Sequence, residues 1–342
     1  MTGFMSPRDL VRRGAERHGA RLAVTSPDVN LSYRELADRT ARIADILKRA
    51  GVGPGIEVAI VLPNCPEFPI WYFGVLEAGA IVVPLSTAQT PSEVADIMEI
   101  AGISFLVTLE DSTLPHQIGF NPAASPGAAA SPGAAASPGA ARRTTLWRVD
   151  RDPGKLATTP WTPQGFLLRR FSSGSTGRPK HMLRTEIAMI DNARQVTETI
   201  GLSEGERYLA IAPFGHGYGL GCLQMAFFLG GSVTVLPRFL PAETLKLARR
   251  DKPTVFMMTP PMVETLATCL LDDGDERAFD SLKHCECSTG RLRKTVHDAF
   301  RRRYSVPDRA HSRSNISSKG HSLCQNRWCR RATATAGKSR KR

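Results

Sequence analysis

Glycines and hydroxyl residues gather before a lysine near the middle of the chain, at residues 172–180. The order is Ser-Ser-Gly-Ser-Thr-Gly-Arg-Pro-Lys. The glycines let successive backbone N–H groups turn inward, the hydroxyls donate hydrogen bonds, and Lys180 adds a positive charge. This set of donors suits a chain of phosphates, although a Ser/Gly-rich surface turn has the same composition. The candidate phosphate ligands are Ser172, Ser173, Gly174, Ser175, Thr176, Gly177 and Lys180. It is not a Walker loop, because Lys180 lies between Pro179 and His181.

Rigid elements on both sides are expected to hold this loop. Residues 165–171 are apolar enough for a strand that runs into it, apart from two arginines. Residues 185–200 carry apolar side chains at helical spacing and predict a helix shortly after it. We therefore expect a polar loop between a strand and a helix.

A second candidate segment, residues 213–221, contains a histidine among glycines, in the order Pro-Phe-Gly-His-Gly-Tyr-Gly-Leu-Gly. Its glycines are at the wrong intervals for a dinucleotide fingerprint, and no acid follows at the ribose distance. His216 is therefore either a structural histidine or an active-site group.

The phosphate-loop motif resembles, position for position, the signature of the adenylate-forming superfamily, which includes acyl- and aryl-CoA synthetases and peptide-synthetase adenylation domains. Residues 31–36 and 76–85 also resemble the family, and these matches are structural. The resemblance implies a loop that grips ATP, with Mg²⁺, while a small-molecule carboxylate attacks the α-phosphate. The acyl-adenylate then passes its acyl group to the thiol of CoA or a carrier protein.

The resemblance also assigns individual roles. Lys180 would neutralise charge on the departing pyrophosphate. His216 resembles the family histidine beside the carboxylate. Ser288-Thr-Gly resembles the start of a segment that lines the adenine, which makes Thr289 and Gly290 candidates, although the expected Ala-Pro does not follow.

Alternating strands and helices predict an α/β fold with parallel sheets flanked by helices. Capping boxes at Ser32 and Thr90 mark two helix starts. The remaining predicted elements are strands at 56–62, 80–84, 104–108, 207–212, 232–236, 254–258 and 281–289, and helices at 66–78, 241–250, 261–270 and 291–300.

Four parts follow from the pattern. They are a first α/β part at 1–121, a linker of Ser-Pro-Gly-Ala repeats at 122–141, a second α/β part at 142–304 with the phosphate loop, and a basic, disordered tail at 305–342. In the superfamily, later segments hold magnesium through a glutamate, bind the ribose through an aspartate and supply a catalytic lysine. None of these segments is recognised in this sequence. We therefore expect an incomplete large domain, in which truncation impairs both acyl-adenylate formation and thioester ligation. A non-catalytic nucleotide-binding remnant and a basic-tailed nucleic-acid binder are the alternatives.

Composition indicates a globular protein of 342 residues with a net charge of +13. Residues 305–342 hold ten Lys or Arg against Asp308 alone, so most of the charge belongs to the tail and no specific nucleic-acid partner is expected. The seven cysteines are odd in number and scattered, which indicates a reducing compartment. The first twenty residues carry charges throughout and lack the apolar segment of a signal peptide, so a cytoplasmic protein is expected. Residues 209–236 lack formal charge but are broken by Pro213 and glycines, so no membrane span is expected.

The cysteine spacing does not favour a metal site. Cys285 and Cys287, taken with Cys324 and Cys329, match no standard zinc pattern, so no protein-held metal is predicted. The carboxylic acid, the thiol acceptor and the oligomeric state stay open.

Overall fold

The computed structural model describes residues 5–118, 142–148, 165–172, 180–304 and 306. The chain divides into two compact units, Met1–Phe239 and Leu240–Arg342, and each is described by itself. The predicted linker at 122–141 and the predicted tail at 305–342 lie almost wholly outside the described residues, so the four-part division stays a prediction.

The first unit contains a sheet with the strand order β6-β5-β3-β4-β7-β8. Its strands are β3 (Glu57–Val61), β4 (Ile81–Pro84), β5 (Phe105–Leu109), β6 (Thr144–Arg148), β7 (Phe166–Ser172) and β8 (Lys180–Thr185). The inner strands are parallel, whereas β6 and β8 run antiparallel at the edges. The sequence predicted the inner strands because they alternate with helices, and it missed both edge strands.

A second sheet in this unit joins distant parts of the chain. The strands β9 (Arg207–Ala210), β10 (Ser232–Val235) and β1 (Leu22–Thr25) are parallel neighbours, and β2 (Asn30–Ser32) pairs antiparallel with β1. The pairing of β1 with β10 aligns Val24 with Val233. Sequence reasoning missed β1 and β2, because pairing over such a separation leaves no local signal.

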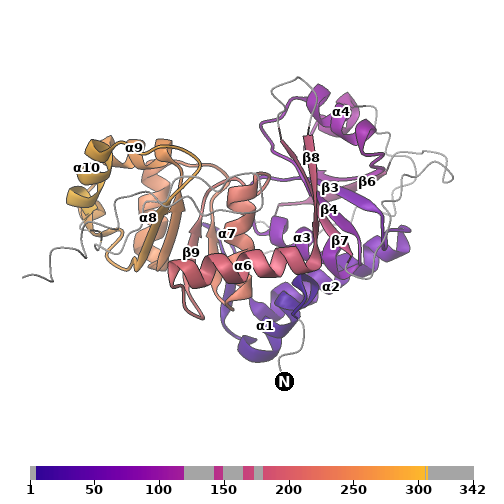
Figure 1. Ribbon diagram of the computed structural model, residues 1–342, viewed down its shortest axis with the longest axis horizontal. Coiled ribbons are helices and arrows are strands. Elements are labelled where there is room, and N and C mark those ends of the chain that lie inside the picture. Colours follow the sequence, from indigo (N-terminus) through magenta and orange to yellow (C-terminus); the bar gives the residue numbers. More distant parts are fainter. Residues whose placement is uncertain (1–4, 119–141, 149–164, 173–179, 305, 307–342) are drawn as a thin grey trace, which may run out of the picture. The chain divides into compact units, whose positions relative to one another are not determined.

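Helices cover these sheets (Figure 1). They are η1 (Pro7–Asp9), α1 (Leu10–His18), α2 (Tyr33–Arg49), α3 (Glu67–Glu77), α4 (Pro91–Ile100), α5 (Leu114–Gln117), α6 (Glu186–Ile200) and α7 (Gly217–Phe228). The capping boxes at Ser32 and Thr90 are confirmed. In α3, Trp71 and Tyr72 are fully buried, so these aromatic residues form part of the core. α6 packs against α7.

The second unit is a smaller α/β assembly. It contains α8 (Pro241–Asp251), β11 (Val255–Met258), α9 (Pro260–Thr268), η3 (Asp275–Arg277), β12 (His284–Cys287) and α10 (Lys294–Tyr304). β11 and β12 are parallel, and α10 packs against α9. Phe256, Phe279 and Tyr304 form a chain of ring contacts between these elements. The strand predicted at 281–289 is shorter than expected because a turn occupies its first residues.

No helix within the described residues combines the length and apolar character needed to cross a membrane. The expected α/β architecture of parallel sheets flanked by helices is confirmed, and in the described residues it consists of two sheets whose strands are mostly parallel.

Candidate functional site

The phosphate-loop sequence connects the two strands of a hairpin. The β7–β8 ladder pairs Ser172 with Lys180 and Phe171 with His181. Ser172 and Lys180, which flank residues 173–179, therefore lie side by side, at a spacing of about 5 Å between paired Cα atoms. Residues 173–179 and the Ser172 side chain lie outside the described residues, so Ser173, Gly174, Ser175, Thr176 and Gly177 remain predicted ligands. The hairpin nevertheless brings Lys180 to the base of the loop.

Cationic side chains share one face of this hairpin. Cross-strand partners point to the same face and alternate residues repeat it, so Arg170 lies on the face of Lys180 and Arg184. Lys180 is exposed, and the two arginines are half-buried. On the opposite face, Phe171 packs against the core of the sheet. The two strands that flank the loop sequence therefore have one face anchored on the core and one face that is positive.

His216 lies close to this positive face. It is the N-cap residue of α7 and its side chain is exposed. Arg170 packs so closely on Gly217 that a Cβ at that glycine would overlap the guanidinium group. Nearby protein atoms that displace water, followed by the Arg170 charge, lower the pKa of His216. The imidazole is therefore biased toward its neutral form, able to accept or donate a hydrogen bond.

A buried asparagine fixes the turn that carries His216. The Asn64 amide nitrogen donates to the carbonyls of Ala210 and Ala212 at 3.1 and 2.9 Å. Its Oδ1 accepts from the backbone N–H of Phe214 at 2.8 Å. Asn64 follows β3 of the first sheet, and its partners lie at the end of β9 of the second sheet and just after it. The side chain therefore ties the ends of strands from both sheets within the first unit.

Glycines in the turn are required by close backbone approach. A Cβ at Gly215 would come within 2.5 Å of the Leu85 carbonyl oxygen, and a Cβ at Gly219 would overlap the carbonyl oxygens of Ala212 and Pro213. This steric need accounts for these two glycines without a dinucleotide.

Thr289 and Gly290 belong to the second unit and follow β12. Thr289 has φ = 75°, a left-handed conformation that is unusual for a β-branched residue. A Cβ at Gly290 would lie 3.3 Å from Cγ of Pro260. Strained residues concentrate at binding sites, which is consistent with the adenine role. That role stays a prediction.

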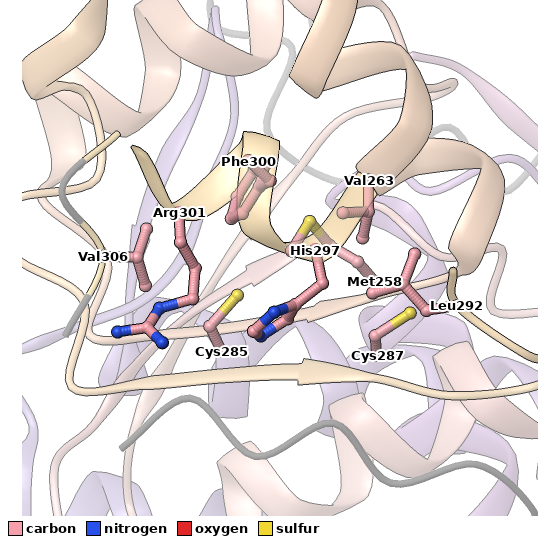
Figure 2. Close-up of a pocket in the computed structure, with 9 residues that line it drawn as sticks. All are labelled: Met258, Val263, Cys285, Cys287, Leu292, His297, Phe300, Arg301 and Val306. Atoms are coloured by element: carbon pink, nitrogen blue, oxygen red, sulfur yellow. The ribbon is translucent and has the colours of Figure 1, made fainter. Parts of the chain in front are cut away.

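The second unit also contains a small pocket between β11, β12, α9 and α10 (Figure 2). Its empty space of about 310 Å³ includes open solvent. Cys285 and Cys287 enter it from β12, and His297 and Arg301 enter from α10. Burial raises the pKa of the Cys287 thiol to about 12, which disfavours the thiolate that binds metals. Within the described ranges, no group of His, Cys, Asp and Glu is arranged to hold a metal ion. Cys324 and Cys329 lie outside those ranges.

The family model described as AMP-binding enzyme matches residues 11–310. The chain belongs to the AMP-binding enzyme family. Among curated members, the long-chain-fatty-acid–CoA ligase of Bacillus subtilis is 26% identical over 322 residues, covering 86% of this chain and 57% of the ligase. The pyochelin synthetase PchE of Pseudomonas aeruginosa is 33% identical over 205 residues, covering 60% of this chain and 12% of the synthetase.

Solved AMP-binding structures share this fold. The inhibitor-bound N-terminal domain of FACL13 from Mycobacterium tuberculosis matches with a TM-score of 0.71 at 18% identity, covering 92% of this chain and 76% of that one. The chain spans just over half the length of the first curated relative and much less of the second.

Sequence reasoning missed Asn64 and Arg170. For Arg170 a signal was present, because two consecutive arginines interrupt an otherwise apolar strand. For Asn64 no local signal existed, since its partners lie 146 to 150 residues further along the chain.

Proposed function

We propose that this chain supplies the ATP and carboxylate sites of an enzyme that activates a carboxylic acid as its adenylate and passes the acyl group to a thiol. The observation that carries the proposal is the β7–β8 register, which closes the loop at Ser172 and Lys180 and puts Arg170 on the face of Lys180. Arg170 in turn lies against Gly217, next to His216. One positive face thus connects the phosphate loop with the residue that the resemblance places beside the carboxylate.

The residues on this face suit ATP. Lys180 would hold the departing phosphates together with the loop hydroxyls and N–H groups of residues 172–177. Thr289 and Gly290 belong to the second unit and not to this face, and the family resemblance alone assigns the adenine to them. Mg²⁺ would arrive with the nucleotide, since it is commonly held by phosphates and only one or two carboxylates. ATP supplies the activated phosphate. The acceptor would be CoA or a carrier-protein thiol.

Neutral His216 would border the reacting carboxylate. Its lowered pKa means that the ring carries no fixed charge near neutral pH, so it orients the acid by a hydrogen bond without ion pairing. Asn64 would keep this ring in place through the turn at residues 210–214.

Binding of MgATP tests the proposal by isothermal titration of the 342-residue chain. We expect Lys180→Ala to weaken binding by about tenfold or more, because one charge-assisted contact to a phosphate is lost. Lys246→Ala, an exposed lysine of α8, is the matched control and should change nothing. Equal affinity for the chain and its Lys180→Ala variant would remove the phosphate-loop assignment.

A second assay separates an enzyme from a nucleotide-binding remnant. Carboxylate-dependent pyrophosphate exchange with aliphatic and aryl acids supports adenylation. Binding of MgATP without any exchange supports the remnant, and retention on nucleic acid without MgATP binding would support the third alternative.

A further inference from the structure

Two neighbouring arginines in β7 have contrasting surroundings. Arg169 is buried and donates to Oε1 of Glu57 through Nε at 3.0 Å and Nη2 at 2.6 Å. Arg170 lies on the opposite face of the strand, and the described part of the chain provides it with no carboxylate partner. Within the described residues, one arginine is thus compensated by a carboxylate and the other is not.

A second cation, Arg184, lies near Arg170 and adds to the positive charge there. Partial burial, followed by the nearby charge of Arg184, lowers the pKa of Arg170, because both disfavour its cationic form. Glu186, the acid nearest to Arg184 in sequence, is already engaged by Ser6 and by Arg8, whose Nε lies 3.8 Å from it. Two half-buried guanidinium groups therefore face the same space, and the part of the chain that the structure describes places no free acid beside them.

The position of Arg170 favours contact with the acid substrate over contact with the nucleotide. Arg170 precedes Ser172 by two residues, so it lies about 7 Å further from the loop along β7. It touches Gly217, on the His216 side. The nucleotide phosphates already have Lys180 and the loop donors under the proposed function.

The charge balance of the reaction indicates which anionic group of the acid the two arginines would bind. The reacting carboxylate loses its charge when it is joined to AMP. A second anionic group on the same acid keeps its charge in the free acid and in the adenylate, so it would neutralise the arginines in both states.

We propose that Arg170 and Arg184 bind a second anionic group of the acid substrate, which makes the substrate class carboxylic acids with a further carboxylate, sulfonate or phosphate. This inference rests on the proposed function for the position of the acid. Arginine suits the role because its planar fork binds a carboxylate or phosphate through two hydrogen bonds.

Titration with matched acids tests the inference. Succinate, adipate, phthalate and isophthalate are each compared with their own monomethyl ester, in the presence of MgATP. We expect at least one diacid to bind at least tenfold more tightly than its monoester, and Arg170→Met to reduce that ratio below twofold. Arg170→Lys should retain part of the preference, and Arg17→Met, an exposed arginine of α1, should retain all of it. Circular dichroism establishes that each variant is folded.

The outcomes distinguish this inference from the proposed function. The inference is overturned if no diacid is preferred to its monoester, or if Arg170→Met keeps the preference. If Arg170→Met weakens the binding of MgATP tenfold while the ratio of diacid to monoester affinity stays the same, the anion bound by Arg170 belongs to the nucleotide. That outcome also overturns the inference. The proposed function fails separately, when MgATP does not bind the wild-type chain or when Lys180→Ala binds it equally well.

Discussion

Removing the Asn64 amide should destabilise the first unit by a predictable amount. Its three hydrogen bonds are buried, with the side chain 2% exposed. Each is worth about 1 kcal/mol net, so Asn64→Ala should cost about 3 kcal/mol. For a unit of this size, that loss corresponds to a decrease in melting temperature of roughly 6 to 12 °C.

Asn64→Asp makes the test sharper, because it changes only the donor side of the amide. The introduced carboxylate still accepts from the Phe214 N–H, but it places an anionic oxygen where the amide nitrogen lay 2.9 Å from the Ala212 carbonyl. This repulsion and burial would raise the pKa of the introduced carboxyl in the folded state. When the pKa of a carboxyl is higher in the folded state than in the unfolded state, its contribution to stability is fully present at pH values below the unfolded-state pKa. That contribution is lost as the pH rises through the folded-state pKa. Asn64→Asp should therefore be closest to wild type near pH 4.5 and least stable near pH 8.

Thermal and urea unfolding at both pH values measure these changes. Asn192→Ala, a half-buried asparagine of α6, is the control and should stay within about 0.5 kcal/mol of wild type. A loss of less than about 0.5 kcal/mol for Asn64→Ala would refute the reasoning. Equal and pH-independent losses for Asn64→Ala and Asn64→Asp would also contradict it, because they would mean that the donor geometry has no role.

Two buried carboxylates yield further predictions. Glu57→Gln leaves Arg169 charged and buried, so denaturant unfolding should show a loss of about 3 to 5 kcal/mol in the free energy of unfolding. The double variant Glu57→Leu with Arg169→Met should lose far less, because no buried charge is left unpaired. Equal losses for the two variants would contradict this. Burial raises the pKa of Glu67, so the native state holds its proton more tightly and stability falls as pH rises through the folded value. Glu67→Gln should therefore raise the melting temperature at pH 7.5 and lose that advantage toward pH 4.5, and a constant difference would exclude the effect.

Much of the candidate site could be predicted because its signals are local. The strand before the phosphate loop and the helix after it follow from periodicity, and both are present as β7 and α6. The strand β8 was missed, because Lys180 to Thr185 is a polar segment whose strand character comes from pairing with β7. Its absence from the prediction hid the hairpin, and with it the common face of Arg170 and Lys180.

Sequence alone determined the family and the helix starts, because a motif, a capping box and an apolar period are each encoded within a few residues. Only the tertiary structure decided which side chains share a space. Asn64 meets Ala210 and Phe214 because the ends of β3 and β9 come together in the first unit. Arg169 acquires Glu57 while Arg170 faces Gly217, a difference that depends on which side of β7 each residue occupies. Such contacts join residues separated by tens to hundreds of positions, and no local pattern encodes them.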